Sequence, residues 1–256
     1  MMSTNNIKVE IINQLEDNYS YIVHSDFNKS AVVVDPADAR PIIENIKKNK
    51  LSLVGIIITH HHSDHTSGIN DLIKFQSVEV FSPDQKINGT SKVIKENDLI
   101  KFDFIEFTVL STPGHTLDHL VYYNNKHKIL FSGDTLFRFG CGRVFEGTYE
   151  QMSKSLQKLE QLNDEIKVYC GHEYTLHNLK FLQSIFCDYD LLKKTENNIN
   201  EHLIKYGTTM PFILGDEKKI NPFLSLKSEH YSNFMIKKDF NLQKMFKYLR
   251  DLRNGY

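Results

Sequence analysis

Two kinds of spacing between apolar residues follow one another along the first two thirds of the chain. Short runs with alternating or continuous apolar positions indicate strands, and stretches with apolar side chains three or four positions apart indicate helices. We therefore predict strands at residues 8–14, 19–23, 31–34, 54–58, 78–81, 104–110, 120–123, 129–131 and 168–170, and helices at 37–48, 68–75 and 149–162. Strands that alternate with helices in this way are typical of a layered α/β core.

The pattern changes from about Leu176 onward, where the apolar spacing is mainly helical. We predict helices at residues 191–206 and 242–252, separated by a stretch at 210–222 that proline and glycine interrupt. A chain of 256 residues can bury one sizeable core and a smaller appendage. The expected organisation is an α/β domain at residues 1–173 and a small α-helical domain at residues 174–256.

The charge balance and the apolar runs narrow the class of protein. The chain has 31 basic and 32 acidic residues, so no global field favours nucleic acid or an anionic membrane. The longest apolar runs, such as residues 54–58, fall far short of the roughly 18 residues that suggest a membrane span. No secretory signal is recognisable at the N-terminus, and the three cysteines form no CxxC pair. We expect a soluble, cytoplasmic monomer without a disulfide framework.

Histidine is the residue type that stands out, because four of the 12 histidines fall within residues 60–65. This segment lies between a predicted strand and a predicted helix. In an extended chain His60 and His62 point to the same side, whereas the adjacent Asp64 and His65 can diverge. Imidazole and carboxylate groups suit zinc, iron and manganese. A solvated turn in which Asp64 caps the following helix explains only one of these residues, so the spacing favours a metal site.

Three further candidates each follow a predicted strand and lie beside or near a glycine: His115, Asp134 and His172. Glycine permits the tight turns that direct side chains from strand ends into a cleft. Each of these short sequences is ordinary when taken alone. Their weight as candidate metal ligands comes from the set and its order.

The chain resembles the metallo-β-lactamase superfamily, whose HxHxDH motif and later single His, Asp and His match these seven positions. The resemblance implies an αββα sandwich with two metal ions, most simply zinc, with iron or manganese as alternatives. One ion would take His60, His62 and His115, the second would take Asp64, His65 and His172, and Asp134 would bridge them. Asp64 and Asp134 would thus be catalytic as ligands. Water between two such cations loses a proton near neutral pH and becomes the nucleophile.

Several segments are more specifically similar to glyoxalase II, the hydroxyacylglutathione hydrolases of methylglyoxal detoxification. They are residues 15–19, 59–65, 112–116, 133–137, 141–148, 170–175 and 221–224. This resemblance implies hydrolysis of S-(2-hydroxyacyl)glutathione, such as S-lactoylglutathione, to D-lactate and glutathione. It also implies that the C-terminal helices help to bind this small thioester.

The same resemblance predicts substrate contacts at Arg143, Phe145, Tyr174 and Lys227. An arginine fork suits a glutathione carboxylate, and the tyrosine hydroxyl offers a directional hydrogen bond. Phe145 stands where the family often has a second tyrosine, and Ser225 stands where it usually has arginine. We expect Lys227, two residues further on, to supply a point charge in place of that arginine.

Two alternatives remain open at this point. The changes at Phe145 and Ser225 also fit another enzyme of the superfamily, a lactonase or a persulfide dioxygenase with one iron. A non-catalytic metal-binding protein that kept the fold is the alternative from a different class. The aspartate at position 134, which matches the bridging ligand of the superfamily, argues against this non-catalytic alternative.

Overall fold

The computed structural model describes residues 7–256, and these form two compact units. The first unit contains the described residues up to Ser111 together with residues 118–127, and the second contains residues 112–117 and 128–256. The units divide the chain differently from the predicted domains, whose boundary at residue 173 stays a prediction. Within residues 7–256 no helix combines the length and the apolar character needed to cross a bilayer.

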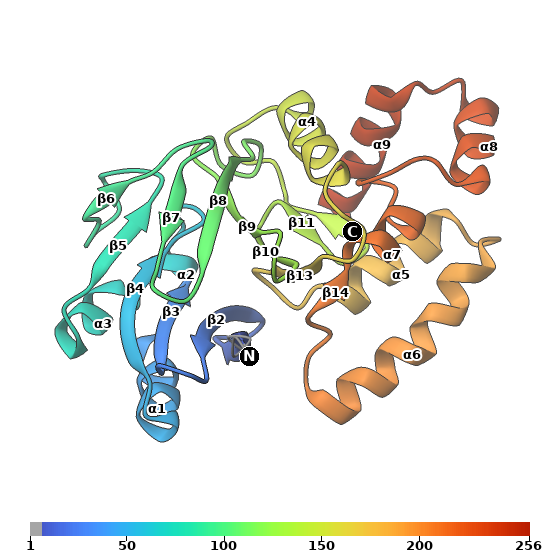
Figure 1. Cartoon of the computed structure of the whole chain (residues 1–256). Coiled ribbons are helices and arrows are strands. Elements are labelled where there is room, and N and C mark those ends of the chain that lie inside the picture. Colours follow the sequence, from blue (N-terminus) through green and yellow to red (C-terminus); the bar gives the residue numbers. More distant parts are fainter. Residues whose placement is uncertain (1–6) are drawn as a thin grey trace. The chain divides into compact units, whose positions relative to one another are not determined.

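A six-stranded mixed sheet forms the first unit's main layer, in the order β1-β2-β3-β4-β5-β6 (Figure 1). β1, β2 and β3 pair antiparallel, whereas β3, β4, β5 and β6 pair parallel. Three further strands of this unit, β7, β8 and β9, form an antiparallel meander. The elements are β1 (Ile7–Gln14), β2 (Asn18–Ser25), β3 (Ser30–Val34), α1 (Ala39–Asn49), β4 (Ser52–Ile57), α2 (Ser63–Thr66), α3 (Ile69–Phe75), β5 (Glu79–Ser82), β6 (Lys92–Val93), β7 (Leu99–Lys101), β8 (Glu106–Ser111) and β9 (Leu120–Asn124).

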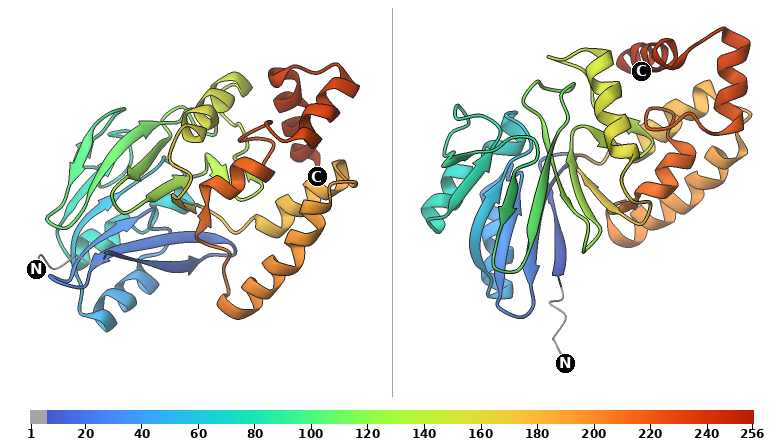
Figure 2. Two further views of the ribbon diagram at one scale, coloured as in Figure 1. Left: turned by 45° about the vertical axis from the view of Figure 1, so that its right-hand side comes forward. Right: turned by 45° about the horizontal axis from the view of Figure 1, so that its top comes forward.

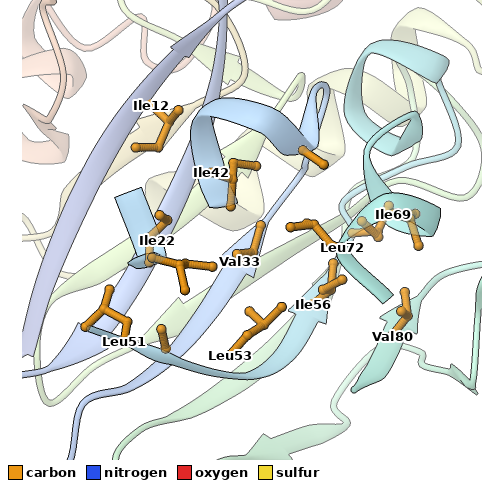
Figure 3. Packing of buried hydrophobic residues seen from close by; sticks show 14 of the residues in the cluster. Ile12, Ile22, Val33, Ile42, Leu51, Leu53, Ile56, Ile69, Leu72 and Val80 are labelled. Atoms are coloured by element: carbon orange, nitrogen blue, oxygen red, sulfur yellow. The ribbon is translucent and has the colours of Figure 1, made fainter. Parts of the chain in front are cut away.

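Helices α1 and α3 cover one face of this sheet with aliphatic side chains. Ile42 of α1 and Leu72 of α3 are fully buried and point toward Val33 and Ile56 of the sheet (Figure 3). Burial of each such side chain stabilises the fold by about 1.5–3 kcal/mol. The side chain of Asp38 caps α1 by accepting a hydrogen bond from the Arg40 amide. This packing gives β3 and β4, the strands that precede the histidine loop, a rigid support.

The second unit joins short strands to a set of helices. β10 pairs parallel with β13, β13 pairs antiparallel with β14, and β11 and β12 form a small hairpin. α4 packs against α9, and α5 packs against α6; Figure 2 shows the helices from α5 onward in yellow-orange to red. The elements are β10 (Ile129–Gly133), β11 (Leu136–Phe137), β12 (Gly140–Cys141), α4 (Tyr149–Glu160), β13 (Lys167–Cys170), α5 (Thr175–Ile185), α6 (Asp190–Tyr206), β14 (Phe212–Ile213), α7 (Leu214–Ile220), α8 (Glu229–Lys238) and α9 (Leu242–Gly255).

Helix α7 was not expected within the stretch that proline and glycine interrupt. Gly215 is the second residue of this helix, and a Cβ there would lie 2.8 Å from Cβ of Asp164 and 3.0 Å from its carbonyl oxygen. The glycine therefore permits a close approach between two backbone segments and does not break the helix. The predicted helix at 68–75 is likewise preceded by the short helix α2, which contains two of the predicted ligands.

Candidate metal centre

Four predicted ligands lie on the loop after β4 and on α2: His60, His62, Asp64 and His65, which we call the loop group. His60 and His65 are buried and His62 is partly exposed. Nε2 of His60 lies 3.1 Å from Nδ1 of His62. Two nitrogens bound to one tetrahedral zinc ion at about 2.0–2.1 Å would be about 3.3 Å apart. The two imidazoles are therefore spaced as ligands of a single cation.

Asp35, which the sequence pattern did not single out, fixes the loop group from behind. Its carboxylate accepts hydrogen bonds from the amide and hydroxyl of Thr59, both at 2.7 Å. Its Oδ2 also lies 3.1 Å from Nδ1 of His65. A proton held on Nδ1 by this carboxylate leaves the Nε2 lone pair of His65 for a metal ion, which is the usual arrangement behind a histidine ligand. Asp35 follows β3 directly, so a sheet strand positions it.

Asn18 explains the first of the family-like segments, residues 15–19. Its side-chain amide donates to Oδ2 of Asp64 at 3.0 Å and to the carbonyl oxygen of Asp64 at 3.3 Å. Oδ2 of Asp64 lies 3.7 Å from Nε2 of His65. Asn18 therefore orients the carboxylate that the resemblance assigns to the second ion.

The other two histidines near the loop group have different surroundings. His61 is exposed, and its Nδ1 lies 3.0 Å from Oδ1 of Asp118. His119 is buried, and its ring stacks on that of His60 with centroids 4.9 Å apart. The backbone bond from Leu120 to the Thr59 carbonyl, at 2.8 Å, places His119 there. His119 therefore packs against a predicted ligand, and His61 points to solvent.

His115, Asp134 and His172 form a second cluster, which we call the strand-end group. Oδ2 of Asp134 lies 3.4 Å from Nε2 of His115 and 3.3 Å from Nε2 of His172. All three residues are at most 5% exposed. Asp134 and His172 come together because they follow β10 and β13, which are parallel neighbours with Gly133 opposite Cys170. The carboxyl ends of parallel strands meet at the same edge of a sheet.

The orientation of His115 is set by a backbone carbonyl. Its Nδ1 lies 2.8 Å from the carbonyl oxygen of Arg143, which can only accept a hydrogen bond. The Nδ1 proton is thereby fixed, and Nε2 presents its lone pair toward Asp134. An imidazole held in this tautomer beside a carboxylate is suited to bind a divalent cation.

The predicted substrate contacts separate into two sets. Arg143 is exposed, its guanidinium lies 5.4 Å from the ring centroid of Phe145, and that ring meets the ring of His115 edge-on at 5.3 Å. Tyr174 stacks on His172 with ring centroids 4.8 Å apart. These three residues therefore flank the strand-end group.

Lys227 and Ser225 have other surroundings. The Lys227 ammonium lies 2.8 Å from Oε1 of Glu160 in the last turn of α4. Lys227 and Ser225 line a cavity of about 210 Å³ together with residues of α4 and α9. Ser225 is 5% exposed, so it offers little surface to a ligand. Recognition of a substrate by Lys227 would require it to leave Glu160.

The buried cysteines lie outside the groups of described residues that could hold a metal ion. Burial raises the pKa of the Cys141 thiol, and burial raises the pKa of Cys170 well above its usual value. Both therefore stay protonated near neutral pH, and a thiol binds metal only as its thiolate. These candidate metal-binding groups consist of imidazole and carboxylate side chains.

Comparison with known proteins gives the family. A model of the metallo-beta-lactamase superfamily matches residues 15–172, and a model of the hydroxyacylglutathione hydrolase C-terminus matches residues 173–256. The hydroxyacylglutathione hydrolase of Bdellovibrio bacteriovorus is 38% identical over 257 residues, which cover 96% of this chain and 97% of that protein. The chain belongs to the hydroxyacylglutathione hydrolase family. The Nitrosomonas eutropha member is 42% identical over 221 residues, 85% of each protein.

Solved structures confirm the fold class of this family member. ETHE1 from Myxococcus xanthus superposes with a TM-score of 0.66 at 22% identity, covering 97% of this chain and all of that one. The BLEG-1 B3 metallo-beta-lactamase gives a TM-score of 0.65 at 22% identity, covering 85% of this chain and 99% of that one. The predicted α/β metallo-β-lactamase fold with a helical C-terminal region is therefore confirmed. All seven predicted ligands belong to histidine and aspartate groups able to hold a metal ion, and the chain is a divalent-metal protein.

Proposed function

We propose that the loop group and the strand-end group together hold two divalent ions, zinc in the first instance and iron or manganese as alternatives. His60, His62 and His115 would bind one ion, Asp64, His65 and His172 the other, and Asp134 both. The observation that carries this assignment is the position of the Asp134 carboxylate, with one oxygen within 3.4 Å of two imidazole nitrogens. A carboxylate placed between imidazoles fits a bridging ligand.

The activity that these residues support is hydrolysis of S-(2-hydroxyacyl)glutathione, such as S-lactoylglutathione, to the 2-hydroxy acid and glutathione. When bound, the ions would lower the pKa of a water molecule and polarise the thioester carbonyl. Water adds to the acyl carbon, the carbon–sulfur bond breaks, and the sulfur leaves as the thiol. No protein nucleophile is needed, which agrees with the ligand-like roles of Asp64 and Asp134.

The chain's own residues would orient the substrate around this reaction. Arg143 lies exposed over Phe145, where its fork can receive a glutathione carboxylate. The Tyr174 ring is held against His172, so its hydroxyl can donate to a peptide group or to the departing sulfur. Phe145 provides an apolar edge beside His115. The cytoplasmic location and the monomeric state stay predictions.

The test is release of free thiol from S-D-lactoylglutathione, with the metal content measured on the same sample. Asp134→Ala is the test variant, and Asp71→Ala, an exposed aspartate paired with Lys74, is the matched control. We expect turnover with about two ions per chain in the wild type and in Asp71→Ala, and loss of turnover in Asp134→Ala. Two ions without turnover would reject this substrate, and lactone turnover would then identify a lactonase. One iron per chain with oxygen uptake would identify a persulfide dioxygenase.

A further inference from the structure

Arg250 of α9 is a buried cation with an unusual set of partners. It is 4% exposed, and its Nη1 donates to the Cys141 carbonyl at 2.8 Å and to the Gly142 carbonyl at 3.4 Å. Its Nε donates to Oδ1 of Asn254 at 3.1 Å, and its guanidinium lies 5.6 Å from the ring centroid of Phe223. Among residues 7–256 no carboxylate forms a hydrogen bond or an ion pair with it. A buried guanidinium directed at backbone carbonyls serves to fix that backbone.

The backbone that Arg250 holds passes directly behind the strand-end group. A Cβ at Gly142 would lie 1.9 Å from the carbonyl oxygen of Asp134 and 3.4 Å from Cβ of His115. The Gly142 amide also donates to the Thr135 carbonyl at 3.2 Å. No side chain fits between this segment and the two predicted ligands, so a displacement of residues 141–143 would be transmitted to both.

The next residue completes the connection. The carbonyl of Arg143 accepts the hydrogen bond from Nδ1 of His115 at 2.8 Å, and this bond determines that Nε2 faces Asp134. Arg250 therefore acts on His115 through a segment of three residues. Its hydrogen-bond and ring partners include neither the predicted ligands nor the predicted substrate contacts.

The hairpin before this segment has separate support. The side-chain amide of Asn221 donates to the carbonyls of Phe137 and Gly140 at 3.2 and 3.1 Å, and Glu217 accepts from the Phe139 amide at 2.8 Å. These bonds hold the turn of the hairpin, whereas Arg250 holds its exit. The roles of the two supports can therefore be separated by mutation.

We propose that Arg250 is a positioning residue for the metal site: through residues 141–143 it fixes the imidazole of His115, so that the C-terminal helix controls how firmly the site retains its metal. This inference rests on the proposed ligand role of His115. It gives α9 a task distinct from contact with the substrate. Loss of an orienting partner behind a ligand typically costs about 10- to 100-fold in metal affinity or activity.

The experiment compares Arg250→Gln, Arg250→Lys and Arg253→Gln in the metal-loaded protein. Arg253 is the matched control, because it lies on the same helix but donates to Oδ1 of Asn178 and lies over Phe181. The readouts are the chelator concentration that removes half the metal, the absorption spectrum of the cobalt-substituted protein, and kcat and KM. Arg250→Met, which keeps an unbranched apolar stem over Phe223, replaces Arg250→Gln if that variant does not fold.

We expect the chelator concentration that removes half the metal to be lower for Arg250→Gln than for the wild type, by up to about 10-fold. The cobalt spectrum should be altered, and kcat should be reduced at a similar KM. Arg250→Lys should recover most of the retention, because an ammonium can also donate to carbonyls. Arg253→Gln should retain metal like the wild type. Wild-type retention and spectrum in a folded Arg250→Gln or Arg250→Met variant would overturn the proposal, even if KM or stability changed.

This readout separates the two proposals. If the wild type holds two ions but does not cleave S-lactoylglutathione, the proposed substrate is rejected and metal retention still tests Arg250. If retention is unaffected by Arg250 while thioester cleavage proceeds, the substrate assignment stands and the positioning role fails.

Discussion

The loop group and the strand-end group differ in how the chain holds them. The four residues of the loop group lie within six positions, and one carboxylate, Asp35, fixes both Thr59 and His65. The three residues of the strand-end group are spread over 58 positions of sequence, from His115 to His172. They are brought together by the parallel pair of strands β10 and β13 and by the backbone of residues 141–143. One group is a local motif, and the other is a product of the tertiary fold.

This difference predicts different responses to mutation. A local motif should fail when a ligand or its direct partner is removed and should be insensitive to distant changes. A group assembled from strand ends should respond to residues that touch no ligand, because packed interiors transmit displacements. The proposed effect of Arg250 is the clearest instance. The predictions below test both groups, in order of decreasing effect.

The largest effect is expected within the loop group itself. His62→Ala removes one of two imidazoles spaced for a single cation. Metal retention and kcat/KM should therefore fall by more than about 100-fold, which is the upper limit typical of residues that only support a ligand. His61→Ala is the matched control, because His61 is exposed and paired with Asp118. Metal analysis and the thiol-release assay measure both variants. Equal losses in the two would show that the loop acts as a histidine-rich tract without defined ligand positions.

Asp35→Asn should have the next largest effect, about 10- to 100-fold in metal retention. The asparagine oxygen at the Oδ1 position can still accept from the Thr59 amide, but the amide group at the Oδ2 position, which faces His65, would donate to Nδ1 and leave the proton on Nε2. The ligand nitrogen would then be protonated. Asp103→Asn, at an exposed aspartate that accepts from Asn28 and Ser30, is the control and should retain metal. Metal retention in both variants is measured by chelator competition. If Asp35→Asn retained metal as firmly as the wild type, the argument about the His65 tautomer would be contradicted.

These supporting residues mark the limit of prediction from the sequence. Seven candidate ligands could be named because their spacing and order are unusual, and long strands and helices could be named from apolar periodicity. Asp35 could not be recognised, because an aspartate after an apolar run is an ordinary strand end. Arg250 could not either, since arginine on an amphipathic helix such as α9 normally indicates the solvent face. Their roles depend on contacts across 24 to 109 positions of sequence.

The same limit applies to the secondary structure. The two-residue strands β11 and β12 are too short to produce a periodic pattern, yet they lead to the segment behind His115. Helix α7 was missed because Gly215 suggested a break, whereas the glycine permits close contact with Asp164. Local signals identify elements that stabilise themselves through burial. They do not identify elements that are stabilised mainly by contacts with residues distant in the sequence.

Glu217, which supports the hairpin next to the strand-end group, should make stability depend on pH. Burial raises the pKa of this carboxyl from 4.5 to about 7. Between these pH values the folded chain keeps a proton that the unfolded chain has lost. The contribution of Glu217 to the free energy of unfolding is therefore largest below pH 4.5 and falls as the pH rises to 7. The expected contribution is about 2 kcal/mol between pH 5 and 7. Metal release in acid affects wild type and variant alike, so only their difference is informative.

Urea unfolding of wild type and Glu217→Gln at pH 5, 6, 7 and 8 provides the measurement. The glutamine does not ionise, so the variant should gain stability relative to the wild type as pH rises, by about 2 kcal/mol between pH 5 and 7. A constant difference between the two proteins would mean that Glu217 does not titrate in this range in the folded state.

The smallest effect is expected at Lys227, and it separates the two sets of predicted substrate contacts. The hydrogen bond that Lys227 donates to the Glu160 carboxylate raises the pKa of Lys227, whose side chain is exposed while that of Glu160 is mostly buried. Because Lys227 is engaged with Glu160, Lys227→Met should leave KM for S-D-lactoylglutathione within about twofold of the wild type. Lys154→Met, which breaks the pair with Glu150 on the same helix, is the control.

Arg143→Met should instead raise KM about tenfold or more, because it removes a fork suited to a carboxylate beside the strand-end group. If Lys227→Met raised KM as much as Arg143→Met, with Lys154→Met unchanged, Lys227 would have to leave Glu160 for the substrate, and binding would then extend to the cavity between α4 and α9.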